Sequence, residues 1–181
     1  MADHEPIGDR FMDLRVPEYA YMFGFLQADG HLQQGVGQKG KLSVEINVRD
    51  IDLLREFQKL TPYNSSITER TRSTNFAKTH HSGRKSKAIA PPRGEFSHRD
   101  YLRGVIDADG SVGYTNKGFP FVSLTTASTA IATYLGRRTQ EVTGAERLVK
   151  RNTRDAIYNV LYTKETPQKL AVHLYCLGTS R

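Results

Sequence analysis

Two aspartates stand at matching places in the chain, and together they could bind a metal ion. Asp29 and Asp109 lie 80 positions apart, and each is preceded by an alanine and followed by a glycine. A hydrophobic segment leads up to each: Tyr-Met-Phe-Gly-Phe-Leu-Gln in the first copy and Tyr-Leu-Arg-Gly-Val-Ile-Asp in the second. Paired carboxylates are ligands that hard divalent cations such as Mg²⁺ prefer. The duplication therefore predicts two similar half-domains that share a metal site.

Both aspartates are expected at the ends of helices. The first helix is predicted to begin at Pro17, because proline suits the first helical position, and to stop at Gly30. The second is predicted between Ser97 and Gly110. A helix end carries partial negative charge, so an aspartate there is unfavourable without a compensating partner. A single Ala-Asp-Gly could simply terminate a buried helix, but two matched copies favour a shared site.

Two further glycines suggest how the helices meet. Gly24 and Gly104 each lie six residues before the glycine that closes their helix. Because glycine has no side chain, these positions would let two helix backbones approach closely. A packing seam through Gly24 and Gly104 would bring the two aspartates side by side.

After each motif helix, the chain is predicted to form a hairpin, a second helix and two more strands. Apolar and polar residues alternate over 41–49, which is typical of a half-buried strand, and residues 122–125 repeat this pattern. Asp50 and Ser128 are expected to cap the second helices; they lie 78 apart, which suggests that the second hairpin is two residues shorter. Further strands are predicted over 66–72, 85–90, 147–154 and 156–162, and a last helix over 167–177.

The composition fits a globular nucleic-acid-binding protein. The 181 residues carry 26 Lys and Arg against 19 Asp and Glu, a net charge of +7, and between Arg70 and Arg93 there is no acidic residue. No apolar run is long enough to span a membrane, and the N-terminus does not read as a secretory signal. A single cysteine excludes an intramolecular disulfide and a cysteine-built zinc site. These features favour a cytoplasmic protein, or one associated with an organelle or a nucleoid, rather than a secreted one.

The duplicated segments resemble the LAGLIDADG motif of homing endonucleases. The second copy, Leu102-Arg103-Gly104-Val105-Ile106-Asp107-Ala108-Asp109-Gly110, departs from it at Arg103 and conservatively at Val105; the first copy is looser, with Gln27 in place of the earlier aspartate. The resemblance implies an α+β fold of two αββαββ halves related by a pseudo-twofold axis. The halves would cover residues 1–90 and 97–181, joined by a linker at 91–96. The motif helices would form the interface, and the antiparallel sheets would form a saddle over DNA.

The resemblance also implies a function. A monomer would cut both strands of a long, nearly asymmetric DNA target by metal-dependent phosphodiester hydrolysis, leaving short 3′ overhangs and mobilising an intron. The metal, Mg²⁺ or another divalent cation such as Mn²⁺ or Ca²⁺, would lie between Asp29 and Asp109, next to Ala28 and Ala108. Basic residues that support catalysis are expected near the strand ends, and the candidates are Arg49, Lys87 and Lys164.

The DNA contacts are expected on the outward strand faces and on nearby basic residues. Arg and Lys side chains can read guanine, Asn can read adenine and Glu can read cytosine. The predicted DNA-binding residues are Lys41, Ser43, Glu45, Asn47, Arg49, Arg70, Arg72, Arg84, Lys85, Ser123, Thr125, Arg147, Lys150, Arg151 and Arg154.

Alternative functions keep the same fold. Arg49 has only the uncharged Thr126-Ala127-Ser128 as its counterpart, so one strand could be cut better than the other, as in a nickase. A catalytically weak or inactive binder is the second possibility, either a DNA-binding regulator or a maturase that binds intron RNA. An intein-embedded nuclease fits poorly, since the chain opens with Met1 and ends without a His-Asn pair.

Overall fold

The fold is α+β, with helices and two small antiparallel sheets. The computed structural model describes residues 11–33, 40–62, 65–69 and 88–176. No helix in these segments is both long and apolar enough to cross a membrane. In chain order the elements are α1 (Pro17–Asp29), β1 (His31–Gln33), β2 (Lys41–Ser43), the 3-10 turn η1 (Val48–Asp50), α2 (Ile51–Leu60), α4 (His98–Asp109), β3 (Gly110–Tyr114), β4 (Pro120–Thr126), α5 (Thr129–Thr143), β5 (Tyr158–Thr163) and α6 (Glu165–Tyr175).

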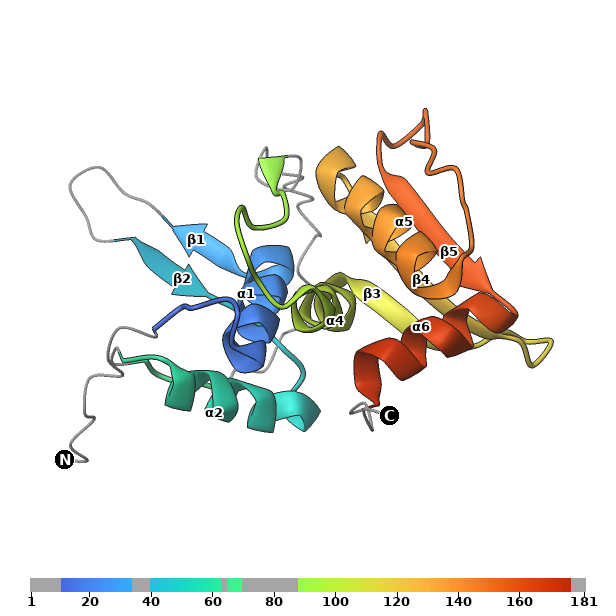
Figure 1. Cartoon of the computed structure of the whole chain (residues 1–181). Helices are drawn as coiled ribbons and strands as arrows, with labels where there is room; N and C mark the ends of the chain where they lie inside the picture. Colours follow the sequence, from blue (N-terminus) through green and yellow to red (C-terminus); the bar gives the residue numbers. More distant parts are fainter. Residues whose placement is uncertain (1–10, 34–39, 63–64, 70–87, 177–181) are drawn as a thin grey trace.

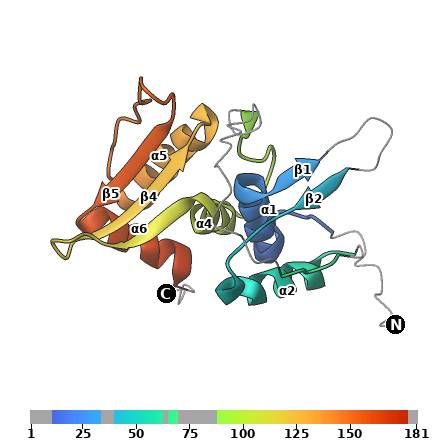
Figure 2. The same ribbon diagram turned by 180° about the vertical axis from the view of Figure 1, so that it is seen from behind.

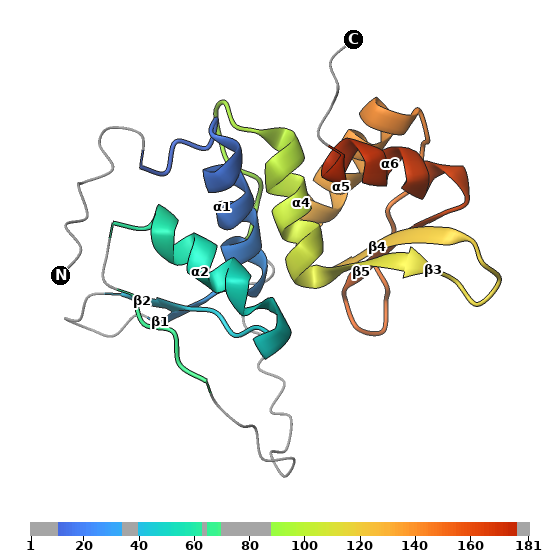
Figure 3. The same cartoon turned by 90° about the horizontal axis from the view of Figure 1, so that it is seen from below.

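The two motif helices, α1 and α4, pack side by side at the centre of the molecule (Figures 1 and 3). Their backbones touch at the two glycines named above. A methyl group on Gly24 would lie 2.3 Å from the carbonyl oxygen of Tyr101, and one on Gly104 would lie 2.2 Å from the carbonyl oxygen of Tyr21. The predicted seam is confirmed, because no larger residue fits at either position without moving a backbone.

The contacts across this seam are reciprocal. Tyr21 and Tyr101 open the two motif copies and, like Gly24 and Gly104, lie 80 positions apart. Each glycine therefore meets the tyrosine of the other copy. The duplication seen in the sequence is thus present in the contacts between the two helices.

A separate hydrophobic core lies on each side of the helix pair. On one side Tyr19, Met22 and Phe25 of α1 pack with Phe57 of α2. On the other side α4, β4, β5, α5 and α6 enclose a larger cluster, to which α1 contributes Ala20. Helix α1 thus has neighbours on several sides, in keeping with a sequence that is apolar nearly all round.

Both motif helices begin and end where predicted, but their closing glycines have a different cause from the one expected. Gly30 and Gly110 have φ of −68° and −100°, which any residue can adopt. Their side-chain positions are instead blocked by carbonyl oxygens, that of Leu26 at 2.2 Å and that of Ile106 at 2.6 Å. Close approach of the backbone, not a left-handed turn, requires glycine at these two positions.

The hairpins that follow the two motif helices have the same register. His31 pairs with Ser43 across β1 and β2, and Ser111 pairs with Ser123 across β3 and β4, so each partner is shifted by the same 80 positions. The prediction of a shorter second hairpin was wrong. The two extra residues of the first half lie in the connection to the second helix, where the chain forms η1.

This turn also corrects the predicted strand over 41–49. Strand β2 ends at Ser43, and Asn47 caps η1 by accepting a hydrogen bond from the Arg49 amide at 3.0 Å. Asp50 precedes α2, but its side chain makes no capping hydrogen bond. The alternation persists only in part: Val44 and Ile46 pack against the core, while Leu42 and Val48 are exposed.

Of the four later strands predicted, one is confirmed, one is wrong, and two lie partly outside the described residues. The strand expected over 156–162 is present as β5, which pairs with β4, and Ser128 caps α5 as expected, with a hydrogen bond of 3.1 Å from the Ile131 amide. Residues 147–154 form no regular strand, because the chain turns there and makes a single bridge between Arg151 and Tyr158. Residues 66–69 and 89–90 are not in strands, and the rest of those two predicted strands lies outside the described residues. The last helix begins at Glu165, two residues earlier than expected.

The two sheets lie toward the same side of the molecule (Figure 3). Helices α5 and α6 cover one face of the three-stranded sheet, and its other face is open (Figure 2). Val122, Leu124 and Thr126 of β4 point into the core, whereas Ser123 and Thr125 between them point outward.

The seam predicts a large loss of stability when its glycines are enlarged. Gly24→Ala and Gly104→Ala should each lower the free energy of unfolding by about 3 kcal/mol or more, since the added methyl meets backbone atoms that cannot rotate away. Urea denaturation followed by circular dichroism measures the change.

Gly136 of α5 provides the matched control. A methyl group there meets only a side-chain methyl of Val149 at 3.1 Å, and alanine gains about 1 kcal/mol in helix propensity. Gly136→Ala should therefore be neutral or stabilising. Equal stability changes at all three positions would contradict the close seam between α1 and α4.

Candidate functional site

The two motif aspartates lie in electrostatic contact at the ends of the packed helices. Asp29 is the last residue of α1 and Asp109 is the last residue of α4. Asp109 is exposed as a residue, yet protein atoms partly desolvate its carboxylate. This desolvation and the negative charge of Asp29 raise the pKa of Asp109 above its ordinary value of 3.8. The helices thus hold two like charges near each other.

This arrangement is chemically suited to a hard divalent cation. Carboxylate oxygens are its preferred ligands, and the last carbonyl groups of a helix have no partner within the helix. The carbonyl oxygens of Ala28 and Ala108, one residue before each carboxylate, belong to that set. Among the described residues, however, no group of three or more His, Cys, Asp or Glu side chains is placed to hold a metal. Water or phosphate oxygens would have to complete the coordination.

Crossed hydrogen bonds restrain the last turn of each motif helix. The Tyr101 hydroxyl donates to Gln27 Oε1 at 2.5 Å, and the Tyr21 hydroxyl donates to Asp107 Oδ2 at 3.0 Å. The tyrosines correspond to each other in the duplication, and so do Gln27 and Asp107. A hydrogen bond therefore joins each helix to its neighbour at the residue two positions before the terminal aspartate. This is the position at which the two copies differ.

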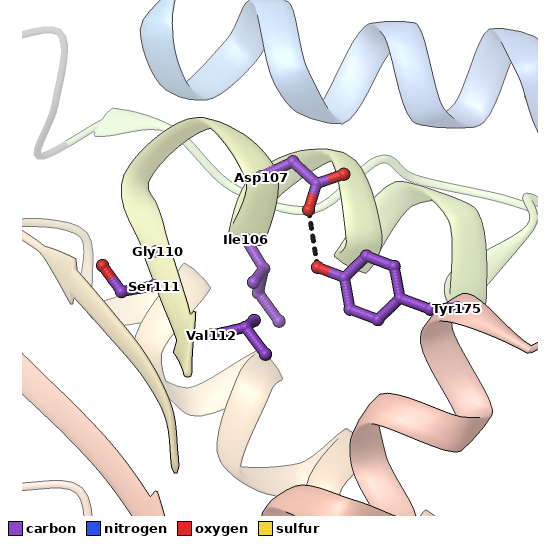
Figure 4. A pocket seen from close by; sticks show the side chains of 6 residues that line it. All are labelled: Ile106, Asp107, Gly110, Ser111, Val112 and Tyr175. Atoms are coloured by element: carbon purple, nitrogen blue, oxygen red, sulfur yellow. Dashed lines mark hydrogen bonds between the residues drawn. The ribbon is translucent and has the colours of Figure 1, made fainter. Parts of the chain in front are cut away.

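The second partners of Gln27 and Asp107 explain that difference. Gln27 Nε2 donates to the carbonyl oxygen of Ala90 at 2.9 Å, which requires a donor at this position. Asp107 Oδ1 instead accepts a hydrogen bond from the Tyr175 hydroxyl at 2.5 Å, within a pocket of about 410 Å³ beside Gly110 and Ser111 (Figure 4). An amide therefore suits the first copy, and a carboxylate suits the second.

A polar pocket opens beside the first carboxylate. It measures about 450 Å³ and is lined by Asp29, His31, Ser43 and Glu45. His31 and Ser43 are cross-strand partners, so they share one face of the first sheet. The candidate metal site is thus continuous with the outward face of β1 and β2.

Two of the three basic residues expected to support catalysis, Arg49 and Lys164, lie in the described segments. Arg49 is exposed in η1, and the described residues after the second hairpin form no such turn. The predicted correspondence between the positions of Arg49 and Ala127 therefore no longer holds. Lys164 follows Thr163, which pairs with Phe121, whereas Gly110 beside Asp109 pairs with Leu124. Lys164 therefore lies toward the far end of the sheet. Lys87 lies outside the described residues.

The predicted DNA contacts fall into two groups in the structure. Lys41, Ser43 and Glu45 are exposed in or just after β2, while Asn47 caps η1 with its side-chain oxygen. Thr125 is exposed and Ser123 half-buried on the outward face of β4. The remaining first-half candidates lie outside the described residues: Arg70, Arg72, Arg84 and Lys85.

The predicted basic residues of the second half border the free edge of β5. An Arg147 guanidinium nitrogen donates to the carbonyl oxygen of Leu161, and Arg151 Nε donates to that of Ala156 at 2.8 Å. Lys150 is exposed between them, and Arg154 pairs with Asp155 at 3.5 Å. These cations flank the sheet rather than occupy its face.

Sequence reasoning missed several residues that the structure brings to the site. Tyr21 and Tyr101 were visible as repeated residues, and their recurrence 80 positions apart was the signal that could have found them. Tyr175 comes from a different element and left no such signal. Asn159 and Leu161 were also missed, and the signal for them was the alternation in β5, which turns both outward.

Residues 97–171 match the family model of the LAGLIDADG-like domain. That match includes α4, Asp109 and the whole of the three-stranded sheet. A search of curated proteins gives no match for the chain.

Residues 97–171 therefore carry a LAGLIDADG-like domain, the domain of the LAGLIDADG homing endonucleases. Proteins with this domain are usually endonucleases that bind DNA, and they generally use divalent metal ions.

The charge of Asp109 should make stability depend on pH. A carboxyl group whose pKa is raised by folding holds its proton to higher pH in the folded state than in the unfolded chain. In metal-free buffer the contribution of the Asp109 carboxyl group to the free energy of unfolding is therefore greatest when the pH is below its ordinary pKa. This contribution is lost as the pH rises through the raised pKa of the folded state. Asp109→Asn should unfold at higher urea concentration than the parent at pH 7, with the difference vanishing near pH 3.

The exposed Asp52 in α2 is the control for this measurement. It pairs only with Arg55 on the surface, and such pairs contribute little. Asp52→Asn should follow the parent profile between those pH values. If Asp109→Asn also followed it, the two carboxylates would not repel each other in the folded protein.

The partner of Gln27 predicts the effect of placing a carboxylate there. In Gln27→Glu an ionised oxygen would replace the donor to the Ala90 carbonyl, so stability at neutral pH should fall by about 2 kcal/mol. At low pH the neutral acid can donate again, and most of the loss should be recovered. Gln168→Glu, on the exposed surface of α6, should show neither effect in the same urea titrations.

Proposed function

We propose that the protein is a site-specific, divalent-metal-dependent endonuclease that cuts both strands of a DNA duplex. The observation that carries the proposal is the pairing of Asp29 and Asp109 at the ends of two helices joined by a reciprocal glycine seam. The seam holds two negative charges together, and the partial burial of the Asp109 carboxylate, with the charge of Asp29, raises the pKa of Asp109. A structure without use for a cation gains nothing from that arrangement.

The proposed mechanism divides the work between the ion and the chain. A bound Mg²⁺ ion would stabilise charge developing on a phosphate and lower the pKa of a water molecule. Asp29 and Asp109 would hold the ion, with the carbonyl oxygens of Ala28 and Ala108 close by. The crossed tyrosine bonds to Gln27 and Asp107 would keep both helix ends in place during the reaction. The pocket lined by His31, Ser43 and Glu45 leaves space for a phosphate group beside Asp29.

The proposal extends to the architecture of the whole chain. The repeated helix contacts and the equal hairpin registers support two halves, 1–90 and 97–181, related by a pseudo-twofold axis. The segment 91–96 would be the linker between them. Two sheets open toward the same side would lie over the major groove of one DNA molecule, and opposite strands would be cut to leave short 3′ overhangs.

The two halves are not equivalent, and this supports unequal cutting of the strands. Arg49 in η1 has no counterpart in the second half, and Gln27 stands where the second copy has Asp107. We propose that one strand is hydrolysed before the other, so that nicked DNA accumulates before the linear product.

A second candidate function is the binding of DNA or of intron RNA without catalysis. The observation that favours it is the absence, among the described residues, of a third acidic or histidine side chain joining the two aspartates. The basic residues bordering β5 would serve such a binder equally well.

Substitution of the two aspartates separates the candidates. Asp29→Asn and Asp109→Asn should each reduce cleavage of a selected target by at least about a hundredfold with Mg²⁺, while binding in a gel-shift assay persists. Mg²⁺ should also raise the melting temperature of the parent, because an ion that binds only the folded state stabilises it. This shift should be lost in the double variant.

Asp52→Asn is the matched control, since Asp52 is an exposed carboxylate of α2 that forms a surface ion pair with Arg55. It should cut and respond to Mg²⁺ as the parent does. Full cleavage by the double variant would rule out the assigned metal site. Tight binding without cleavage or a Mg²⁺-dependent thermal shift in the parent would favour the second candidate.

A further inference from the structure

The three-stranded sheet presents an open face without charge. Strands β3, β4 and β5 read Gly-Ser-Val-Gly-Tyr, Pro-Phe-Val-Ser-Leu-Thr-Thr and Tyr-Asn-Val-Leu-Tyr-Thr, with no acidic, basic or histidine residue. Tyr158, Val160 and Tyr162 are buried, so Asn159 and Leu161 between them point outward. This face lies on the side of the molecule that also carries the first sheet (Figures 2 and 3).

Two outward rows of side chains follow from the strand register. Ser111, Ser123 and Leu161 are successive partners across the three strands. Thr125 and Asn159 form the next row, and the Thr125 hydroxyl donates to Asn159 Oδ1 at 3.0 Å. This hydrogen bond orients the amide: Nδ2 keeps two hydrogens to donate, and Oδ1 keeps a second lone pair to accept.

Leu161 is an exposed apolar member of this surface. Its side chain remains 39% exposed although it lies in the middle of a strand. It stands two residues from Asn159 on the same face, which places the two side chains about 7 Å apart along the strand. An oriented amide and an exposed aliphatic group are therefore neighbours beside the hydroxyl groups of Ser123 and Thr125, and the half-buried Phe121 lies in the row beyond Ser123.

Cations border this face but do not enter it. Arg147 and Arg151 are bonded to carbonyl groups of the chain beside and along β5, and Lys150 lies between them. A nucleic-acid duplex whose phosphate backbone ran along that edge would place the base edges of its groove over Asn159 and Leu161. In B-DNA the interior of the major groove displays base edges, while phosphates line its sides.

We propose that Asn159 and Leu161 select A·T base pairs in the half of the target that contacts the second sheet. This inference rests on the proposed DNA binding. An asparagine amide matches the donor and acceptor of adenine N6 and N7, and an apolar side chain packs on the thymine methyl group. Thr125 acts as a positioning residue because it fixes the orientation of the amide.

The first sheet has a different chemistry, which makes the two half-sites unequal. Its outward face carries His31 and Lys41, and Glu45 follows β2. Lysine matches the acceptors of guanine, and glutamate accepts from cytosine. The first half is thus suited to G·C pairs, and the second to A·T pairs.

Selection from a randomised duplex library tests the inference without requiring cleavage. The double variant Asp29→Asn, Asp109→Asn is used as the parent, so that failure to cut does not affect the result. Selected sites should contain A·T pairs at two or more neighbouring positions on one side. Adding Asn159→Ala should reduce affinity for the best site about tenfold and remove the preference for adenine at one position.

Modified bases then identify the atoms involved. Replacing thymine by uracil at the relevant position removes one methyl group and should weaken binding of the parent about fourfold, but should have little further effect on Leu161→Ala. Replacing adenine by 7-deazaadenine should likewise weaken the parent but not Asn159→Ala. Thr125→Val should lower the adenine preference while leaving the response to uracil unchanged.

Exposed residues of α6 provide matched controls on the covered side of the sheet. Gln168→Ala and Val172→Ala should bind and discriminate as the parent does. A selected site whose binding is insensitive to Asn159→Ala, Leu161→Ala and both base analogues would overturn this inference alone. A library that yields no selected sequence would instead overturn the site-specific DNA binding on which it rests.

Discussion

The close approach of two helix backbones determines the rest of this structure. At Gly24 and Gly104 the helices α1 and α4 are separated by less than the space of a methyl group. That distance places Asp29 and Asp109 next to each other despite their like charges and the negative ends of both helix dipoles. The cores on either side, around Phe57 and around α5 and α6, supply the packing that offsets this repulsion.

The same seam explains why the two copies of the motif need not be identical. The crossed tyrosines require only a hydrogen-bond acceptor two residues before each aspartate, and both an amide and a carboxylate provide one. A second hydrogen-bond partner decides between an amide and a carboxylate. That partner is the backbone carbonyl of Ala90 for Gln27 and the hydroxyl of Tyr175 for Asp107. The departure of Gln27 from the motif is therefore a local hydrogen-bonding requirement, which does not alter the aspartate at the helix end.

Residue type and repeated spacing predicted the motif helices and their contact, whereas alternation alone did not predict which segments pair as strands. Both motif helices, the glycine seam and the cap at Ser128 follow from residue type and spacing, and the structure confirms them. The strand over 41–49 failed because its alternation continues into a 3-10 turn capped by Asn47, where pattern alone does not show that pairing has stopped. The strand over 147–154 failed because its residues meet β5 through arginine side chains and one bridge. The metal at Asp29 and Asp109 remains a prediction.

An uncharged face bordered by cations also separates affinity for the phosphate backbone from discrimination between bases, which a uniformly basic surface combines. Contacts from arginine and lysine to phosphates contribute affinity without regard to sequence, and they weaken as salt is added. Side chains that meet base edges contribute discrimination instead, and a mobile cation among them would tolerate several bases. With Arg147 and Arg151 held at the edge of β5 by carbonyl groups, Asn159 and Leu161 would meet the duplex of the proposed complex without a competing charge. Under this proposal, base discrimination by the second sheet would depend on hydrogen-bond geometry and methyl contacts, which salt affects little.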